Sequence, residues 1–300
     1  MKEKGKGVRP LVTEINQVST LKNPEISEVN QLITALQKKK NLSFKLNKGM
    51  IAEENPYVNH ILYRNQGVLL GYMLLSAYDP QELEVTTVFD GTQQEFMLMY
   101  TCLKQYGKEK NNKNCLFIID QEDALLTSII KELEIPYAFS EYHMRFNQDY
   151  LTTFNKTKSL ELLDAQESDR EFIVRLNEER FDNQEITTKE LMEVELEGIQ
   201  LVRVNGEIVG KLKVDNYQGE VGIYGFMVAP HIRGQGVGRA TLEAVITTIY
   251  KNKIDKLYLE VESTNARALH LYQSMGFRIE AKFDYYDEKY SINTDKSRTN

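Results

Sequence analysis

A glycine-rich segment, RGQGVG at residues 233–238, separates an apolar stretch at 222–228 from an amphipathic one at 239–250. The first stretch is predicted to be a strand and the second a helix. Glycines at the start of a helix let backbone N–H groups come close to a bulky anion, and the helix dipole adds positive charge there. The segment therefore predicts a phosphate-binding turn, unless the glycines only allow a helix to pack tightly on a strand.

The flanking arginines favour phosphate, because guanidinium groups are charge-assisted donors to phosphate oxygens. The segment has no GK[ST], which excludes a P-loop, and its glycine spacing is not GxGxxG, which makes a dinucleotide fold a poor fit. The candidate binding residues in this segment are Arg233, Gly234, Gln235, Gly236, Val237, Gly238 and Arg239.

The order of predicted elements repeats along the chain. The expected helices are 24–40, 92–106, 123–133, 168–180, 188–196, 239–250 and 266–275, and the expected strands are 60–64, 67–78, 82–89, 115–120, 137–146, 199–204, 207–214, 222–228, 256–261 and 277–285. Residues 64–71 align with 203–210 at low identity, so the shared order is what favours duplication over chance. For 300 residues this predicts two α/β domains, 1–150 and 151–300, with a polar linker at 147–158.

Charge and composition exclude several partners. The net charge of −7 argues against nucleic acid, which needs a basic face. Cys102, Cys115 and the four scattered histidines have no ligand spacing, so no metal and no disulfide framework are predicted. No apolar run approaches the roughly 20 residues that span a bilayer, and no apolar region of a signal peptide follows the basic N-terminus. We therefore expect a cytoplasmic protein with no metal, no nucleic acid and no membrane partner.

Two motifs in order identify a family. The pattern RxxGxG at 233–238, after a strand that ends in VAP, resembles the pyrophosphate-binding signature of the GCN5-related N-acetyltransferases (GNAT family). The segment LEVESTNARALHLYQSMGF at 259–277 is similar to that family's second signature. The resemblance covers 155–290 in detail and 10–148 as a degraded copy. It implies two GNAT-like acyl-CoA N-acyltransferase domains in tandem, each a mixed, mostly antiparallel sheet flanked by helices.

The resemblance also implies where acetyl-CoA binds. In the family the cofactor lies where two parallel strands separate, and its pantetheine arm pairs with the strand before the loop. That strand edge corresponds here to Phe226, Met227 and Val228, whose main-chain groups alone are needed. Asn265 would hydrogen-bond the pantetheine, or it is the N-cap of the helix that begins at Ala266.

Acetyl transfer to an amine needs two proton movements. Tyr272 lies where the family places a tyrosine near the cofactor sulfur, so it is expected to protonate the leaving thiolate; the alternative is a tyrosine that only packs in the core. Many relatives carry a carboxylate base on the strand before the loop, but this chain has Tyr224 and Gly225 there. Glu260 is the remaining candidate base, with Glu262 on the same face only if no bulge intervenes. A base that works through water, or none at all, stays open.

Two further regions carry expectations. The segment DGTQQEFMLMY at 90–100 stands where a working first-half loop would lie, but it keeps one glycine, has no arginine and contains Glu95, which would repel phosphate. The first half is therefore not expected to bind acyl-CoA. Near the C-terminus, an aromatic cluster either lines the acceptor site or packs in a hairpin that turns at 287–289. Its members are Phe283, Tyr285, Tyr286 and Tyr290.

The expected activity is therefore transfer of an acetyl group from acetyl-CoA to a primary amine, on a small molecule, a protein N-terminus or a lysine, at one active site in the second half. The alternative is a non-catalytic module that senses acetyl-CoA. The protein is expected to be a monomer or a homodimer.

Overall fold

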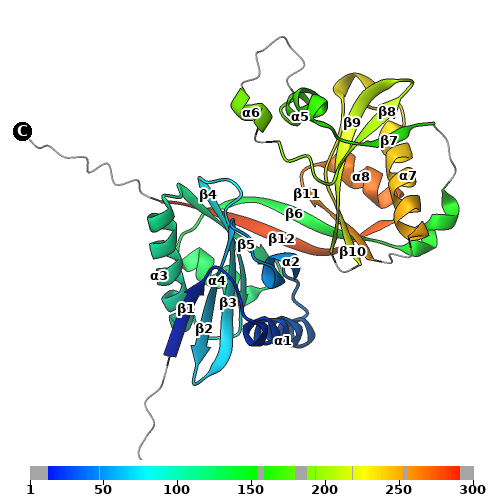
Figure 1. The fold of residues 1–300 in the computed structure, drawn as a ribbon. Helices are drawn as coiled ribbons and strands as arrows, with labels where there is room; N and C mark the ends of the chain where they lie inside the picture. The colour runs from blue at the N-terminus through cyan, green and yellow to red at the C-terminus, as the bar shows by residue number, and fades with distance from the viewer. Residues whose placement is uncertain are drawn as a thin grey trace, which may run out of the picture. The chain divides into compact units, whose positions relative to one another are not determined.

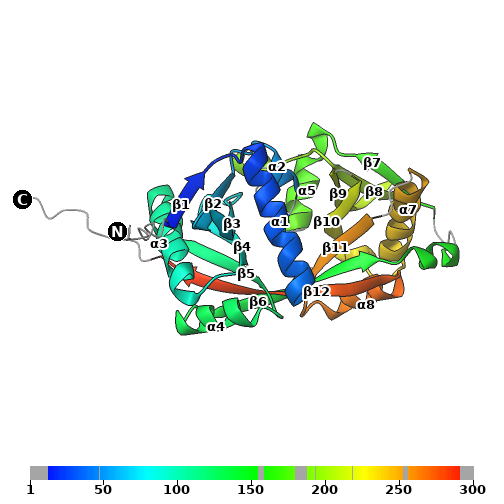
Figure 2. The same cartoon turned by 90° about the horizontal axis from the view of Figure 1, so that it is seen from below.

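The computed structural model describes residues 13–46, 48–154, 159–179, 188–192, 194–217, 219–252 and 256–290. The chain divides into two compact units, whose elements are labelled in Figures 1 and 2. Unit 1 contains residues 1–140 and 281–300, and unit 2 contains residues 141–280.

Unit 1 is built from the first half of the chain and its last strand. Its elements are β1 (Thr13–Val18), α1 (Asn23–Lys40), α2 (Lys48–Ala52), β2 (Val58–Asn65), β3 (Val68–Ser76), β4 (Glu82–Phe89), α3 (Gln93–Lys110), β5 (Asn114–Asp120), α4 (Ala124–Glu132), the start of β6 (Tyr137–Phe146) and most of β12 (Phe277–Lys289). Its strand order is β1-β2-β3-β4-β5-β12. Among these strands only β4 and β5 run parallel.

Unit 2 repeats this plan. Its elements are the remainder of β6, a 3-10 helix (Gln148–Thr153), β7 (Glu161–Asp164), α5 (Arg170–Asn177), α6 (Thr188–Met192), β8 (Ile199–Val204), β9 (Glu207–Tyr217), β10 (Glu220–Val228), α7 (Val237–Lys251), β11 (Lys256–Glu262) and α8 (Ala266–Ser274). The strand order is β7-β8-β9-β10-β11-β6, and among these strands only β10 and β11 are parallel. The expected mixed, mostly antiparallel sheets flanked by helices are confirmed.

In each unit, one strand of the parallel pair has a neighbour that comes from the other half of the sequence. In unit 1, residues 283–289 of β12 pair antiparallel with β5. In unit 2, residues 141–145 of β6 pair antiparallel with β11. The units therefore differ from the expected division at residue 150, because the division falls within β6, after Ser140, and again within β12, after Glu280.

The sheet of unit 2 separates two cores. Leu257, Leu259 and Val261 alternate along β11 and pack with α7 and α8 on one face. Ile199 and Leu201 of β8 pack on the opposite face, toward α5. These two faces, called here the α7 face and the α5 face, can be followed in Figure 1. They determine from which side each functional group approaches the strands.

The C-terminal strand is longer than predicted. Residues 287–289, expected to be a hairpin turn, continue β12 and pair with residues 114–116 of β5. The prediction of a turn was wrong because the charged side chains of these residues find hydrogen-bond partners on α3 and β5. The Glu288 carboxylate accepts a hydrogen bond of 2.6 Å from the Tyr100 hydroxyl, and Asp287 accepts one of 3.0 Å from Asn114.

Candidate functional site

The turn before α7 is open at two of its three glycines. Gly234 and Gly236 have φ values of +80° and +81°, and a Cβ atom at either would meet no atom within 4 Å. A Cβ atom on Gly238, by contrast, would lie 3.2 Å from Leu271 Cδ2. The first two glycines therefore provide a backbone conformation that other residues rarely adopt. Only Gly238 serves close packing between α7 and α8.

The N-terminus of α7 follows the glycine turn directly. The helix begins at Val237 with Gly236 as its N-cap, and no side chain in the described part of the chain caps it. The Gln235 side-chain amide points back along the loop and donates to the His231 carbonyl oxygen, 3.3 Å away. The first N–H groups of a helix have no partners within the helix, so this end is suited to bind an anion.

The two arginines of the loop are directed to different partners. Arg233 Nε donates to the Val228 carbonyl oxygen at 2.7 Å, and its Nη2 lies 2.5 Å from a carboxylate oxygen of Glu179. Arg239 Nη2 donates to the Ser274 hydroxyl at 2.6 Å. Arg233 thus ties the loop to the end of β10, whereas Arg239 ties the first turn of α7 to the end of α8. Their role as phosphate donors stays a prediction.

Strands β10 and β11 separate at the loop. Their parallel pairing covers only residues 220–223 and 256–259. Beyond it, Met227 and Val228 pair with β9 on the far side, and β11 pairs with β6 through Glu262. A β-bulge between Tyr224 and Met227, with Gly225 at φ +51°, bends β10 away. The residues predicted to bind pantetheine, 226–228, therefore lie on the strand segment that has left β11.

Glu260 lies on β11 beside this separation. Leu259 and Val261 face the α7 core, so alternation turns Glu260 to the α5 face. Its side chain is 13% exposed, and one carboxylate oxygen lies 3.5 Å from Nδ1 of His143, its register partner on β6. Glu262 is directed to the same face, where its carboxylate accepts a hydrogen bond from Thr264. A carboxylate thus stands at the point where the parallel strands part.

Tyr272 lies on the α7 face of the sheet, opposite to Glu260. It lies on α8, is 7% exposed and packs in the α7 core with its ring centroid 6.0 Å from that of Phe277. Within the described ranges no group hydrogen-bonds to its hydroxyl. Burial raises the pKa of Tyr272 to about 12, so the phenol keeps its proton at neutral pH. Core packing, the alternative considered for this residue, is correct for the ring and leaves the hydroxyl free to donate.

A cluster of rings on the α5 face could not be assembled from the sequence. The hydroxyls of Tyr224 and Tyr258 share a hydrogen bond, and the His143 ring stacks on Tyr258 with centroids 5.0 Å apart. Burial raises the pKa of both tyrosines. The only indication of this cluster in the sequence was Tyr224, which stands where many relatives carry a carboxylate. His143 comes from the first half of the sequence, and only the pairing of β6 with β11 brings it to Glu260.

Asn265 and the C-terminal rings have structural roles. Asn265 Oδ1 accepts a hydrogen bond of 3.1 Å from the Ala268 N–H, which confirms the N-cap interpretation for α8. The C-terminal rings are buried in unit 1, so packing, and not a pocket lining, is their role there. These rings are Phe283, Tyr285, Tyr286 and Tyr290.

In unit 1, helix α3 occupies the position that α7 has in unit 2, but its N-terminus is capped by side chains. At the start of α3, Thr92 is the N-cap and Glu95 completes a capping box. The Glu95 carboxylate accepts hydrogen bonds from the Thr92 N–H, Tyr63 and Asn65, each at 2.8 Å. These bonds, the one from Thr92 above all, lower its pKa to about 2. An internal carboxylate therefore occupies the anion site of this helix, and β3 pairs with β4 without a bulge.

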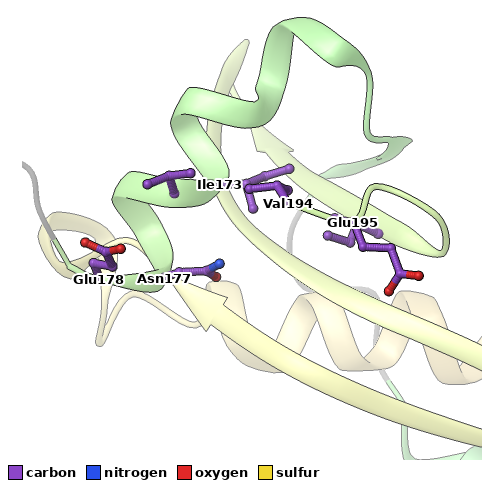
Figure 3. A pocket seen from close by; sticks show the side chains of 7 residues that line it. Ile173, Asn177, Glu178, Val194 and Glu195 are labelled. Carbon is purple, nitrogen blue, oxygen red and sulfur yellow. The ribbon is translucent and has the colours of Figure 1, made fainter. Parts of the chain in front are cut away.

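A pocket of about 260 Å³ lies on the α5 side of unit 2 (Figure 3). Asn177 and Glu178 stand at the end of α5, and Val194 and Glu195 stand on the segment that leads to β8. The remaining lining residues are Ile173, Val174 and Ile199. The pocket combines apolar walls with carboxylates.

Neither metal nor membrane features occur in the described ranges. They contain no group of three or more histidine, cysteine, aspartate or glutamate residues placed to hold a metal ion. No helix within them is both long enough and apolar enough to cross a bilayer.

Comparison with known proteins relates unit 2 to one family. Residues 160–277 match the model of the acetyltransferase (GNAT) family. The probable spermine N(1)-acetyltransferase of Bacillus subtilis subsp. natto is 33% identical over 81 residues, which cover 26% of this chain and 52% of that protein. The [ribosomal protein bS18]-alanine N-acetyltransferase of Escherichia coli is 41% identical over 58 residues, covering 19% and 39%. The chain thus spans about half, or less, of the length of these relatives.

A solved structure shares the fold of nearly the whole chain. A tandem GNAT protein from the clavulanic acid biosynthesis pathway superposes with a TM-score of 0.71, covering 94% of this chain and 100% of that one at 9% sequence identity. At this identity the likeness establishes the fold alone.

Proposed function

Because residues 160–277 match the model of the acetyltransferase (GNAT) family and the chain superposes on a tandem GNAT protein, we propose that this chain transfers an acetyl group from acetyl-CoA to a primary amine. The observation that carries the proposal is the N-terminus of α7, which no described side chain caps and which lies beside the separating strands β10 and β11. An anion site next to a strand segment that has left its parallel neighbour suits a ligand with a pyrophosphate and an amide-bearing arm. The loop fits this ligand, since Gly234 and Gly236 leave its surface clear.

The candidate groups suit the two proton movements. An aliphatic amine has a pKa of about 10.4 and an α-amino group has a pKa of about 8, so both must lose a proton before they attack. Glu260 would accept that proton, directly or through water, from the α5 face. As the amine nitrogen bonds to the carbonyl carbon, the C–S bond breaks, and Tyr272 would donate a proton to the departing sulfur from the α7 face. The candidate base Glu260 and the candidate acid Tyr272 thus lie on opposite faces of the sheet of unit 2.

The acceptor is proposed to enter from the α5 face. The pocket between α5 and β8 opens there, and its lining includes the Glu178 carboxylate and the Glu195 carboxylate, which is ion-paired with Lys213. The two relatives act on different acceptors by name, a polyamine in one case and a protein alanine in the other. They therefore do not choose between a small molecule and a protein N-terminus.

The test is release of CoA, followed with a thiol reagent, from acetyl-CoA and a panel of amines, amino acids and peptides. We expect at least one class to be turned over with stoichiometric N-acetyl product by mass spectrometry. A chain that binds acetyl-CoA yet acetylates no member of a broad panel would instead be a non-catalytic acetyl-CoA sensor.

Unit 1 is proposed to be a degenerate copy that binds no acetyl-CoA. The Glu95 carboxylate fills the end of α3, and helix α4 contains no tyrosine. Calorimetric titration is therefore expected to give one acetyl-CoA site per chain. Two sites per chain, or a site that survives a change confined to the loop of unit 2, would contradict this assignment.

A further inference from the structure

Lys211 is a buried amine on the α5 face of unit 2. It lies on β9 opposite Leu201 of β8, whose side chain packs toward α5. Residues directly opposite in antiparallel strands point to the same face, so Lys211 is directed there too. The residue is only 7% exposed. A lysine is rarely this buried unless it is paired.

The amine of Lys211 stands at the bulge of β10. A Cβ atom on Gly225 would lie 3.3 Å from Lys211 Nζ, which places the amine beside the point where β10 leaves β11. In the part of the chain that the structure describes, no hydrogen bond or ion pair involves this amine. Other cations of the same sheet are paired: Lys213 Nζ lies 2.7 Å from Glu195, and Arg145 Nη1 lies 3.2 Å from Glu220.

A buried ammonium without a partner is costly, because its lost hydration is not replaced. Burial accordingly lowers the pKa of Lys211. An anion delivered by a ligand would restore the charged form and offset that cost. The pyrophosphate of acetyl-CoA is not the anion in question, because its proposed site is the N-terminus of α7, which packs on the opposite face. The acceptor, proposed above to enter from the α5 face, is the molecule that can supply the anion.

Resting on the acetyl transfer proposed above, we propose that Lys211 binds a carboxylate of the acceptor, so that the substrates are small amino-carboxylates. The same face presents Glu260 at the separation of the strands and Lys211 at the bulge. An acceptor with an amine and a carboxylate places its amine toward Glu260 and its carboxylate toward Lys211. An amine that carries further positive charge would meet the Lys211 ammonium and is disfavoured.

The experiment compares matched acceptors that differ only in the carboxylate, such as an amino acid and its decarboxylated amine, in wild type and in Lys211→Met. Wild type is expected to favour the carboxylate member by about 10–100-fold in kcat/KM, the size of one charge-assisted hydrogen bond. Lys211→Met should remove the preference through KM, and Lys211→Arg should restore part of it. Lys256→Met is the control: this lysine is exposed at the start of β11, so this variant should keep the preference.

A second measurement needs no turnover. Reductive methylation of Lys211, followed by peptide mass spectrometry, should slow when N-acetylglycine is present but not when N-acetylglycinamide is. If wild type acetylates amines with no preference for carboxylates and N-acetylglycine does not protect Lys211, the inference is overturned while acetyl transfer stands. If no amine is acetylated, protection of Lys211 alone decides whether the anion site exists.

Discussion

A Gly236→Glu variant is expected to lose acetyl-CoA binding, with Kd raised by at least about 100-fold, because two effects add. Gly236 has φ +81°, where any side chain costs roughly 1–2 kcal/mol, and the new carboxylate would stand at the uncapped end of α7. It would there take the place of the pyrophosphate, as the Glu95 carboxylate already fills the end of α3. Isothermal titration with acetyl-CoA measures the loss.

Gly219→Glu is the matched control for this variant. Gly219 has φ +82° directly before β10, and a Cβ atom there would also meet no atom within 4 Å. This control carries the same backbone strain and the same charge at the opposite end of β10 from the loop. Gly236→Ala isolates the strain alone and should weaken binding much less than glutamate does. Unaltered affinity in Gly236→Glu would remove the assignment of the loop to the pyrophosphate.

A Tyr272→Phe variant is expected to lower kcat by roughly 10²–10⁴-fold, the usual contribution of a general acid, with little change in the Kd of acetyl-CoA. The ring keeps its packing against Phe277, so the fold should be preserved. Tyr250→Phe, which removes a hydroxyl elsewhere on the ring cluster of the same core, serves as the control. A thioester with a more acidic leaving thiol needs less proton donation. The difference in kcat between wild type and Tyr272→Phe should therefore be smaller with such a thioester. An equal gap with both thioesters would show that Tyr272 is not the acid.

The pH dependence follows from the same residue. The pKa of Tyr272 is raised to about 12, so the acid form is present throughout the neutral and mildly alkaline range. Activity should therefore rise with pH as the acceptor amine loses its proton, with no decline from Tyr272 up to about pH 10. If the activity of the wild type declined below pH 10 and the Tyr272→Phe variant showed no such decline, a phenol of this pKa would be contradicted.

The donor side of the site could be predicted from the sequence because its parts are contiguous. A strand, a glycine turn and a helix follow one another within 220–251, so local pattern and turn chemistry identify them together. The structure adds the division of labour: Gly234 and Gly236 are open, whereas Gly238 serves packing. No linear pattern distinguishes these roles, since they depend on what lies opposite each glycine.

The acceptor side could not be predicted because it is assembled by pairing between distant strands. His143 reaches Glu260 only through the β6–β11 ladder, and Lys211 reaches Gly225 only because a bulge shifts the register of β10 against β9. Register over long sequence separation is decided by the whole sheet. For the same reason the charged end of β12 resembled a turn until its partners on β5 were known.

The exchange of strands also sets an order of events during synthesis. The edge of β5 is completed at Asp120, but its partner β12 begins only at Phe277. At ribosomal rates of about 5–20 residues per second, that edge waits roughly ten to thirty seconds for its partner. Unit 2, by contrast, receives β6 before any other strand of its own. The half of the protein that is made first is thus the half whose sheet is finished last, and a chaperone or ribosome-bound factor that shields an exposed strand edge would act on unit 1.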